Sequence, residues 1–493
     1  MADASPDSIL RLIENSEKGL AQIEMSLPAI LEARQAVLEA IEKQDGRNII
    51  LELTLVILDS LLAENEVIYD ISASMNALLR ATDDYTKRYY MQILNLCFCE
   101  ACQLFEGETS DRNGILSRME NLTRELMQTG CQFIAKHIVD DIKAFKEEYV
   151  DKELRNITRH YDDPIKMYEK LLGLTNIDFF AKGTSQLMAI RMEVSVVSSF
   201  LLNLVLPLEN NPQRAKMTPT KQRIDFMKIF NDAILKSFKR RNVKDVVQQL
   251  LSKGQDSLDA SYRLYDNCSK AKVFLDERSI QMPDQFIKLE SLILLRMEVL
   301  YLRYDIACSI WGYLNAASDM ERSQNLRLIH ITKHAALTHI YGYNETFREK
   351  SLWARIKAIK EANDDNLNTD KVEKLLNKLT VNLTEDCARS NMFTHYRYEQ
   401  EFYIPLRLKA FEKMSHYNEL TNSLKLLDVC KSLEEYIIRL LYRIDEAQKT
   451  ARKKQYDEWM AKLGDFVDKI GNNEKSSQIL KSLKTYIDDL YLN

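Results

Sequence analysis

Residues 69–74 read Tyr-Asp-Ile-Ser-Ala-Ser and residues 304–309 read Tyr-Asp-Ile-Ala-Cys-Ser, so the chain repeats itself at a distance of 235 residues. The same displacement aligns further identical pairs on both sides of this stretch, namely Lys18 with Lys253, Leu79 with Leu314, Gly107 with Gly342 and Tyr168 with Tyr403. A repeat of this length is not a solenoid unit, which recurs at about 20–50 residues. The sequence therefore predicts an internal duplication, whose two copies pack around a pseudo-two-fold axis as subunits of a homodimer do about a true one.

The composition favours long helices. The 493 residues include only 12 Gly and 8 Pro, and no convincing run of alternating strand residues is present. We expect an all-α protein made of two tandem antiparallel helical bundles. The expected boundaries are copy one at 1–208, a connector at 209–241, copy two at 242–445 and a C-terminal helical tail at 446–493.

The connector has an excess of basic residues, although the chain as a whole is acidic. The formal net charge is -5, which does not indicate a binder of polyanions. Between Asn210 and Lys244, however, ten basic residues face only two acidic ones. This run is either a solvated face or a phosphate-contacting surface, and the second reading predicts RNA contacts from Arg214, Lys216, Lys239, Arg240 and Arg241.

The termini and apolar stretches predict a cytoplasmic protein without a membrane segment. Asp3 and Asp7 interrupt any apolar core of a secretory signal. The most apolar stretch, Val194 to Leu208, contains several polar residues and falls short of the ~20 residues that a membrane span needs. We expect it to be a buried helix.

Two groups of metal-ligand residue types are present, the cysteines near residue 100 and the histidines His330, His334 and His339, and neither predicts a metal site. Cys97, Cys99 and Cys102 do not form a standard zinc pair, so buried thiols are the expected reading. His330 and His334 are four apart and share one helix face, but no acidic ligand is adjacent in the sequence. The sequence therefore predicts neither a metal nor a cofactor.

One polar segment occurs in both copies and could carry chemistry. Residues 155–161 read Arg-Asn-Ile-Thr-Arg-His-Tyr, and residues 389–396 read Arg-Ser-Asn-Met-Phe-Thr-His-Tyr. A histidine can take a proton from a ribose hydroxyl or protonate a leaving oxygen, and an arginine can grip phosphate oxygens. Asn can orient either group. Such a set would suffice for cleavage of RNA through its own 2′-hydroxyl without a metal.

The spacing favours a site shared between the copies. Asn156 and His160 are four apart and share a helix face, whereas Arg155 and His160 are rotated by roughly 140° on an ideal helix. The arginine of one copy could instead serve the histidine of the other. We expect the first motif on the last turns of one long helix, since Asp163 and Pro164 predict the start of the next.

The first motif resembles the signature of the HEPN superfamily, an arginine followed after four to six residues by a histidine. The resemblance implies a helical bundle that pairs with another to form a shared cleft, in a metal-independent RNase of toxin–antitoxin, abortive-infection or CRISPR-linked defence systems. It implies cleavage residues Arg155, Asn156 and His160 in copy one. Copy two matches more loosely through Arg389, Asn391 and His395, because Ser390 follows the arginine there.

Two other interpretations remain open. His160 and His395 could satisfy buried polar groups at helix ends. The duplicated bundle could also be a non-catalytic module that binds RNA, a nucleotide or a partner protein, as some HEPN-like proteins do. On the nuclease reading, the expected partners are RNA and an antitoxin or another protein.

Overall fold

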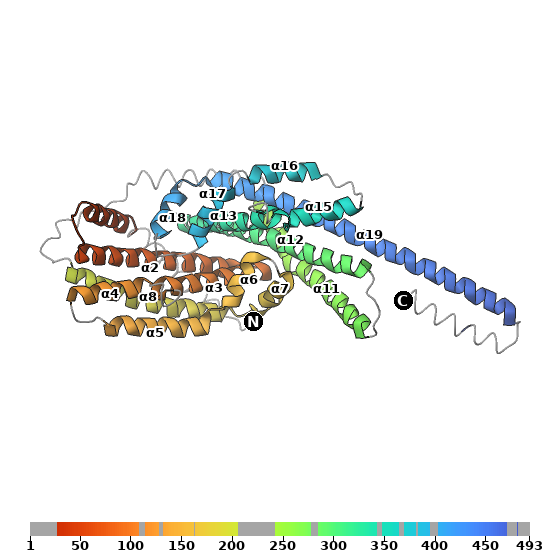
Figure 1. The fold of residues 1–493 in the computed structure, drawn as a ribbon, viewed down its shortest axis with the longest axis horizontal. Helices are drawn as coiled ribbons and strands as arrows, with labels where there is room; N and C mark the ends of the chain where they lie inside the picture. The colour runs from red at the N-terminus through yellow and green to blue at the C-terminus, as the bar shows by residue number, and fades with distance from the viewer. Residues whose placement is uncertain are drawn as a thin grey trace. The chain divides into compact units, whose positions relative to one another are not determined.

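The computed structural model of the protein describes residues 27–107, 114–127, 132–161, 163–205, 242–277, 284–342, 348–363, 369–380, 383–394, 403–470 and 481. These residues form helices and no strand (Figure 1). The predicted all-α class is therefore confirmed for the part of the chain that the structure describes.

The chain divides into two compact units. The first comprises residues 1–262 and 297–431, and the second comprises residues 263–296 and 432–493. This division groups residues by packing, whereas the predicted boundaries group them by sequence repeat. The predicted boundaries at 208, 241 and 445 consequently stay a prediction.

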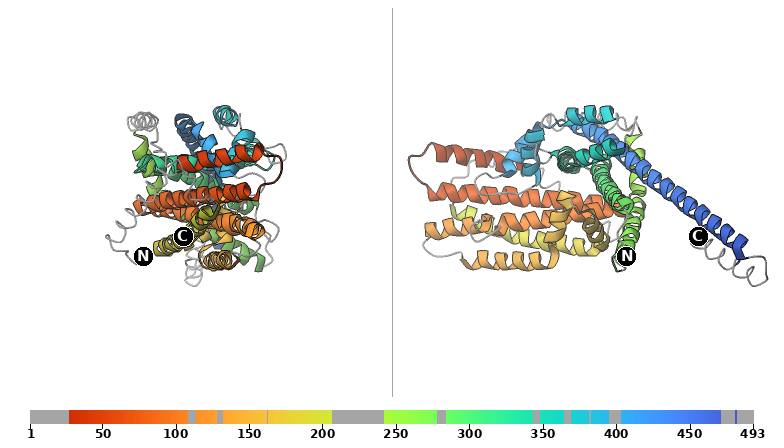
Figure 2. Two further views of the ribbon diagram at one scale, coloured as in Figure 1. Left: turned by 90° about the vertical axis from the view of Figure 1, so that its left-hand side faces the viewer. Right: turned by 45° about the vertical axis from the view of Figure 1, so that its right-hand side comes forward.

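A helical bundle forms one part of the first unit (Figures 1 and 2). Within it α2 packs against α3, α4 and α8, and α5 packs against α3, α4 and α8. The helices are α2 (Ile49–Arg80), α3 (Asp84–Glu106), α4 (Ile115–Met127), α5 (Gln132–Tyr149) and α8 (Ile177–Val205). Two short helices, α6 (Lys152–His160) and α7 (Pro164–Gly173), connect α5 to α8, and α6 packs on α3.

Helix α13 (Asp319–Tyr341) organises the rest of the first unit. It packs against α2 and α6, which precede it in the chain, and against helices that follow it. These later helices are α15 (Leu352–Asn363), α16 (Thr369–Leu379) and α17 (Leu383–Thr394), while α18 (Tyr403–Glu412) packs on α17 and α2. The first unit also holds α10 (Val243–Ser252).

Three of the described helices have residues in both units. They are α11 (Gly254–Glu277), α12 (Asp284–Asn315) and α19 (His416–Ile470). Inside the second unit their segments are joined by ion pairs, with Lys272 Nζ 3.8 Å from Glu290 and Arg296 3.9 Å from Glu434.

The helix boundaries repeat at the displacement found in the sequence. α12 and α2 are both 32 residues long, α13 and α3 are both 23 residues long, and each later helix begins 235 positions after its counterpart. Asp83 and Ser318 cap the N-termini of α3 and α13 through side-chain oxygens. Both helices end at a glycine with positive φ, 100° at Gly107 and 79° at Gly342, a conformation that favours glycine.

Two equivalent residues of these helices touch each other. The hydroxyl of Tyr90 on α3 donates to Oδ1 of Asn325 on α13 at 2.8 Å, and the two positions are 235 apart. Contact between equivalent residues is what a two-fold axis passing between them would give. The pseudo-two-fold relation of whole copies stays a prediction.

Helix α8 differs from the sequence expectation. One face is buried through Phe180, Leu187, Ile190, Val194 and Leu201. The opposite face exposes large apolar side chains at every fourth position, namely Met192, Val196, Phe200 and Leu204. The prediction of a buried helix therefore holds for one face only. In the described part of the chain, α8 alone is long and apolar enough to cross a bilayer, which is weak evidence because core helices share these properties.

Candidate functional site

The first predicted motif lies on a short separate helix. The expected long helix is interrupted at Val150, and α6 begins after Asp151, whose carboxylate accepts a hydrogen bond from Leu154 N at 2.9 Å. The expectation of one continuous helix was therefore wrong. Asn95 on α3 fixes this junction, because its side chain donates to the Asp151 carbonyl at 2.9 Å and accepts from the Asp151 amide at 2.8 Å.

The three residues of this motif have different surroundings. Arg155 is half-buried and donates to Glu100 on α3 at 2.6 Å and to Gln103 at 3.4 Å. Glu100 is almost fully buried, so its charge is balanced by Arg155. Asn156 is exposed. The side chain of His160 lies outside the described residues.

Helix α6 ends as the sequence indicates, close to the start of α7. Tyr161 adopts the left-handed conformation with φ 52°, which stops the helix. Asp163 then caps α7 by accepting from Lys166 N at 3.0 Å, and Pro164 follows as the first helical residue. The predicted start of a helix at Asp163–Pro164 is confirmed.

The second predicted motif lies at the C-terminal end of α17. Arg389 is half-buried and forms an ion pair with Asp386 one turn earlier, at 3.4 Å, and Asn391 is exposed. His395 follows the last residue of α17 and lies outside the described residues, as do all five predicted RNA contacts of the connector, Arg214, Lys216, Lys239, Arg240 and Arg241. The separation of the two motif histidines stays a prediction.

One small cavity is lined by α17, which carries the second motif, and by α3, on which the first motif helix packs. Its volume is about 20 Å³, enough for roughly one water molecule. Glu100, the partner of Arg155, lines it from α3, and Phe393 and Thr394, which immediately precede His395, line it from α17. Asp70 on α2 and Arg327 on α13 complete its charged lining. We refer to it below as the shared cavity.

A buried charge cluster lies beside the shared cavity and was not predicted. It consists of Glu66 and Asp70 on α2, Arg327 on α13 and Arg407 on α18, all nearly inaccessible to water. Arg407 Nη1 lies 3.0 Å from Glu66 and 3.4 Å from Asp70, and Arg327 pairs with both carboxylates. Burial raises the pKa of Glu66, and the nearby Arg407 and Arg327 guanidinium groups oppose that rise. Two cations and two anions make the cluster electrically balanced.

Arg407 connects the charge cluster to the second motif. Its Nε donates to the carbonyl of Met392 and its Nη2 to the carbonyl of Phe393, both at 3.3 Å. These are among the last carbonyl groups of α17, which have no partner inside the helix. Arg407 thus caps the end of α17, immediately before the position of His395.

Asp305 on α12 is a second buried carboxyl group, and it lies 235 residues after Asp70, at the equivalent position of the repeat. Asp305 accepts hydrogen bonds from the hydroxyls of Tyr85 at 2.8 Å and Tyr161 at 2.7 Å. Burial raises the pKa of Asp305 to about 6, and the hydrogen bonds from Tyr161 and Tyr85 limit the rise. Tyr161 therefore connects the end of the first motif helix to α12.

The remaining sequence predictions concern cysteine and histidine. Cys97, Cys99 and Cys102 are buried, and burial raises the pKa of each thiol, so the expectation of buried thiols is confirmed. His330 is fully buried with Nδ1 3.4 Å from Glu419 of α19, an acidic residue distant in the sequence. Lys333 lies 2.7 Å from the same carboxylate, and this cation makes a metal site with His330 unfavourable.

No family model matches the chain, and no similar protein was found among curated proteins or solved structures.

Proposed function

We propose that the protein is a metal-independent endoribonuclease of HEPN type, of the kind that acts as a toxin or phage-defence effector. In this mechanism His160 and His395 act as general base and general acid. One takes the proton of a ribose 2′-hydroxyl and the other protonates the leaving oxygen. Arg155 clamps the phosphate and Asn156 orients it, with Arg389 and Asn391 supporting the same cleft.

The observation that carries the proposal is the common support of the two motif helices. Glu100, the partner of Arg155, lines the shared cavity together with Phe393 and Thr394 of α17. α6 and α17 also pack against the same helix, α13. A site that needs one arginine and one histidine from different copies requires such a common support.

The surroundings of the motifs favour fixed side chains rather than mobile ones. The buried Glu100 carboxylate holds Arg155 in one orientation, and Arg407 holds the last turn of α17. Preorganised groups stabilise developing charge without reorganisation during the reaction. Asn156 and Asn391 remain exposed, so an RNA strand can reach both.

The direct test is RNA cleavage in the presence of EDTA. Purified protein should cleave single-stranded RNA, and His160→Ala or His395→Ala should lower the rate by at least ~100-fold, since each removes an acid–base group. His137→Ala on α5 is the matched control, because this histidine is exposed and outside both motifs. Cleavage that is absent in the wild type, or equal in wild type and His160→Ala, would reject the nuclease.

The alternative is a helical module that binds RNA, a nucleotide or a partner protein without turnover. The small volume of the shared cavity favours it, because no substrate group larger than about one water molecule fits there. Tight RNA binding with no cleavage, unchanged in His160→Ala, would support this reading. A cytoplasmic location and an antitoxin partner belong to the nuclease proposal.

A further inference from the structure

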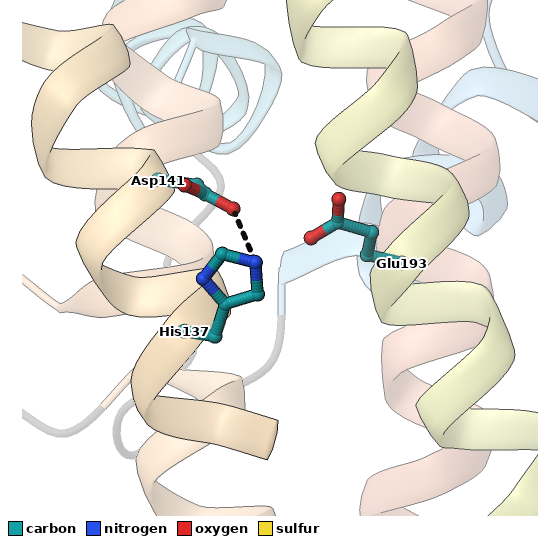
Figure 3. Close-up of side chains that lie close together, drawn as sticks. All are labelled: His137, Asp141 and Glu193. Carbon is teal, nitrogen blue, oxygen red and sulfur yellow. Dashed lines mark ion pairs between the residues drawn. The ribbon is translucent and has the colours of Figure 1, made fainter. Parts of the chain in front are cut away.

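Three potential metal ligands from two helices meet on the surface of the first unit (Figure 3). His137 and Asp141 lie one turn apart on α5, with Nε2 of the imidazole 3.6 Å from Oδ2 of the carboxylate. Glu193 approaches from α8, and one ligand atom from each residue lies within 4.8 Å of the others. The imidazole nitrogen thus faces two carboxylates.

We propose that His137, Asp141 and Glu193 bind a divalent transition-metal ion, with Zn²⁺ as the representative ion. Zinc takes imidazole nitrogen and carboxylate oxygen at about 2.0–2.2 Å, which places tetrahedral ligand atoms roughly 3.4 Å apart. The His137–Asp141 separation is already close to this value. The ligand atom of the exposed Glu193 lies within 4.8 Å of the other two, so it needs to move by at most about 1.4 Å, and water supplies the fourth ligand.

The packing of α5 on α8 sets these ligands opposite one another. At Gly183 a side chain would collide with the rings of Tyr149 of α5 and Phe98 of α3, so the backbone of α8 packs directly against these two rings. Gly183 and Glu193 are about 15 Å apart along α8, and Tyr149 and His137 are about 18 Å apart along α5. The close contact at Gly183 therefore fixes the register of the ligands at the other end.

The ligand types select among metals. Mg²⁺ and Ca²⁺ prefer six or more oxygen ligands, and a histidine with two carboxylates does not supply them. Imidazole suits zinc, copper and nickel. Mg²⁺ therefore serves as the negative control in a binding experiment. The proposed site departs from the sequence expectation that the protein binds no metal.

The site is independent of the proposed nuclease. About 18 Å of α5 separates His137 from Tyr149, which precedes the first motif helix. A bound ion would join α5 to α8 and stabilise their packing. RNA cleavage in EDTA tests the nuclease, whereas metal binding tests this site, so the two proposals can fail separately.

Titration calorimetry with ZnCl₂ on the full chain tests the site, with a thermal melt as a second readout. We expect one Zn²⁺ per chain, a rise in melting temperature with Zn²⁺ but not with Mg²⁺, and binding weakened on the order of tenfold or more in His137→Ala and in Glu193→Gln. Asp140→Asn is the matched control, since it removes an exposed carboxylate beside the ligand set on the same helix.

The variants separate a defined site from general attraction to acidic or thiol groups. All three positions lie at the surface, and circular dichroism of each variant checks that the helices are retained. Zn²⁺ binding that is equal in wild type, His137→Ala and Glu193→Gln, or reduced equally in Asp140→Asn, would overturn the proposal. So would the absence of Zn²⁺ binding to the wild type.

Discussion

Asp70 and Asp305 occupy equivalent positions in α2 and α12, and the protein accommodates them in opposite ways. Asp70 is paired with Arg327 and Arg407, whereas Asp305 accepts hydrogen bonds from two tyrosine hydroxyls. Each carboxyl group is nevertheless held by residues of the other predicted copy. The two equivalent aspartates therefore join the predicted copies in both directions, Asp70 through ion pairs and Asp305 through hydrogen bonds.

The difference teaches how a carboxyl group can be buried. Desolvation of a carboxylate is costly, and either a paired cation or a shift toward the neutral form offsets that cost. Near Asp70 two guanidinium groups supply the cations. Near Asp305 the donors among the described residues are hydroxyls, and its pKa is raised to about 6. The first arrangement should depend on charge and the second on pH.

The largest expected effect comes from removing one cation of the charge cluster. Arg407→Met should lower the free energy of unfolding by about 3–5 kcal/mol, because two buried carboxylates then share one guanidinium group. It should also loosen the end of α17, which Arg407 caps. Chemical denaturation measures the first effect, and hydrogen exchange of α17 amides measures the second.

Arg124→Met is the control for this substitution. Arg124 is exposed and pairs with Glu120 one turn earlier, an arrangement worth about 0.5 kcal/mol or less. A loss in Arg407→Met no larger than the loss in Arg124→Met would show that the charge cluster contributes little to stability.

The next effect is a pH dependence specific to Asp305. Because its pKa is raised to about 6, the folded state holds the proton more tightly than the unfolded state. The free energy of unfolding contributed by this group therefore falls as pH rises from about 4 to about 6. Asp305→Asn cannot titrate, so the wild type should lose about 2–3 kcal/mol relative to the variant between pH 4 and pH 7.

Urea denaturation of both proteins at several pH values measures this difference. Asp140→Asn, an exposed carboxylate on α5, should keep the pH dependence of the wild type. Parallel stability profiles for wild type and Asp305→Asn would mean that Asp305 titrates normally in the folded state.

A smaller loss of stability should follow from adding a side chain at Gly312, where neighbouring residues leave no room for one. A β-carbon there would collide with the hydroxyl of Tyr90 and with Asn325, the two equivalent residues that touch. Gly312→Ala should cost about 1–3 kcal/mol by overpacking. Gly173→Ala is the control, because nothing lies within 4 Å of the added atom. Thermal melts that rank the two variants equally would rule out a tight contact at Gly312.

The smallest effect compares the equivalent caps of α3 and α13. Asp83→Ala and Ser318→Ala should each cost about 1 kcal/mol, since each removes the acceptor for an N-terminal amide. Asp83→Ala should cost more, because the Asp83 carboxylate also accepts from the Thr86 hydroxyl at 2.9 Å. Denaturation midpoints of the two variants measure the ranking, and a reversed order would contradict it.

Part of the candidate site could be predicted and part could not. Asp163 and Pro164 give the start of α7, because an N-cap and the proline after it act within one turn. The break before α6 was missed, although Asp151 is a good N-cap, because it stands in a charged run that reads as continuous helix. The partner of Arg155 lies on α3, and no local pattern links Arg155 to Glu100.

The sequence by itself determined the helical class, the repeat at 235 residues and several helix ends. These properties arise from composition, periodicity and capping, which act between residues within a few positions of one another. Tertiary structure alone decided that Asp70 meets two arginines, that Asp305 meets two tyrosines and that Glu193 faces His137. Those pairings join residues distant in the chain, so they depend on how the helices pack.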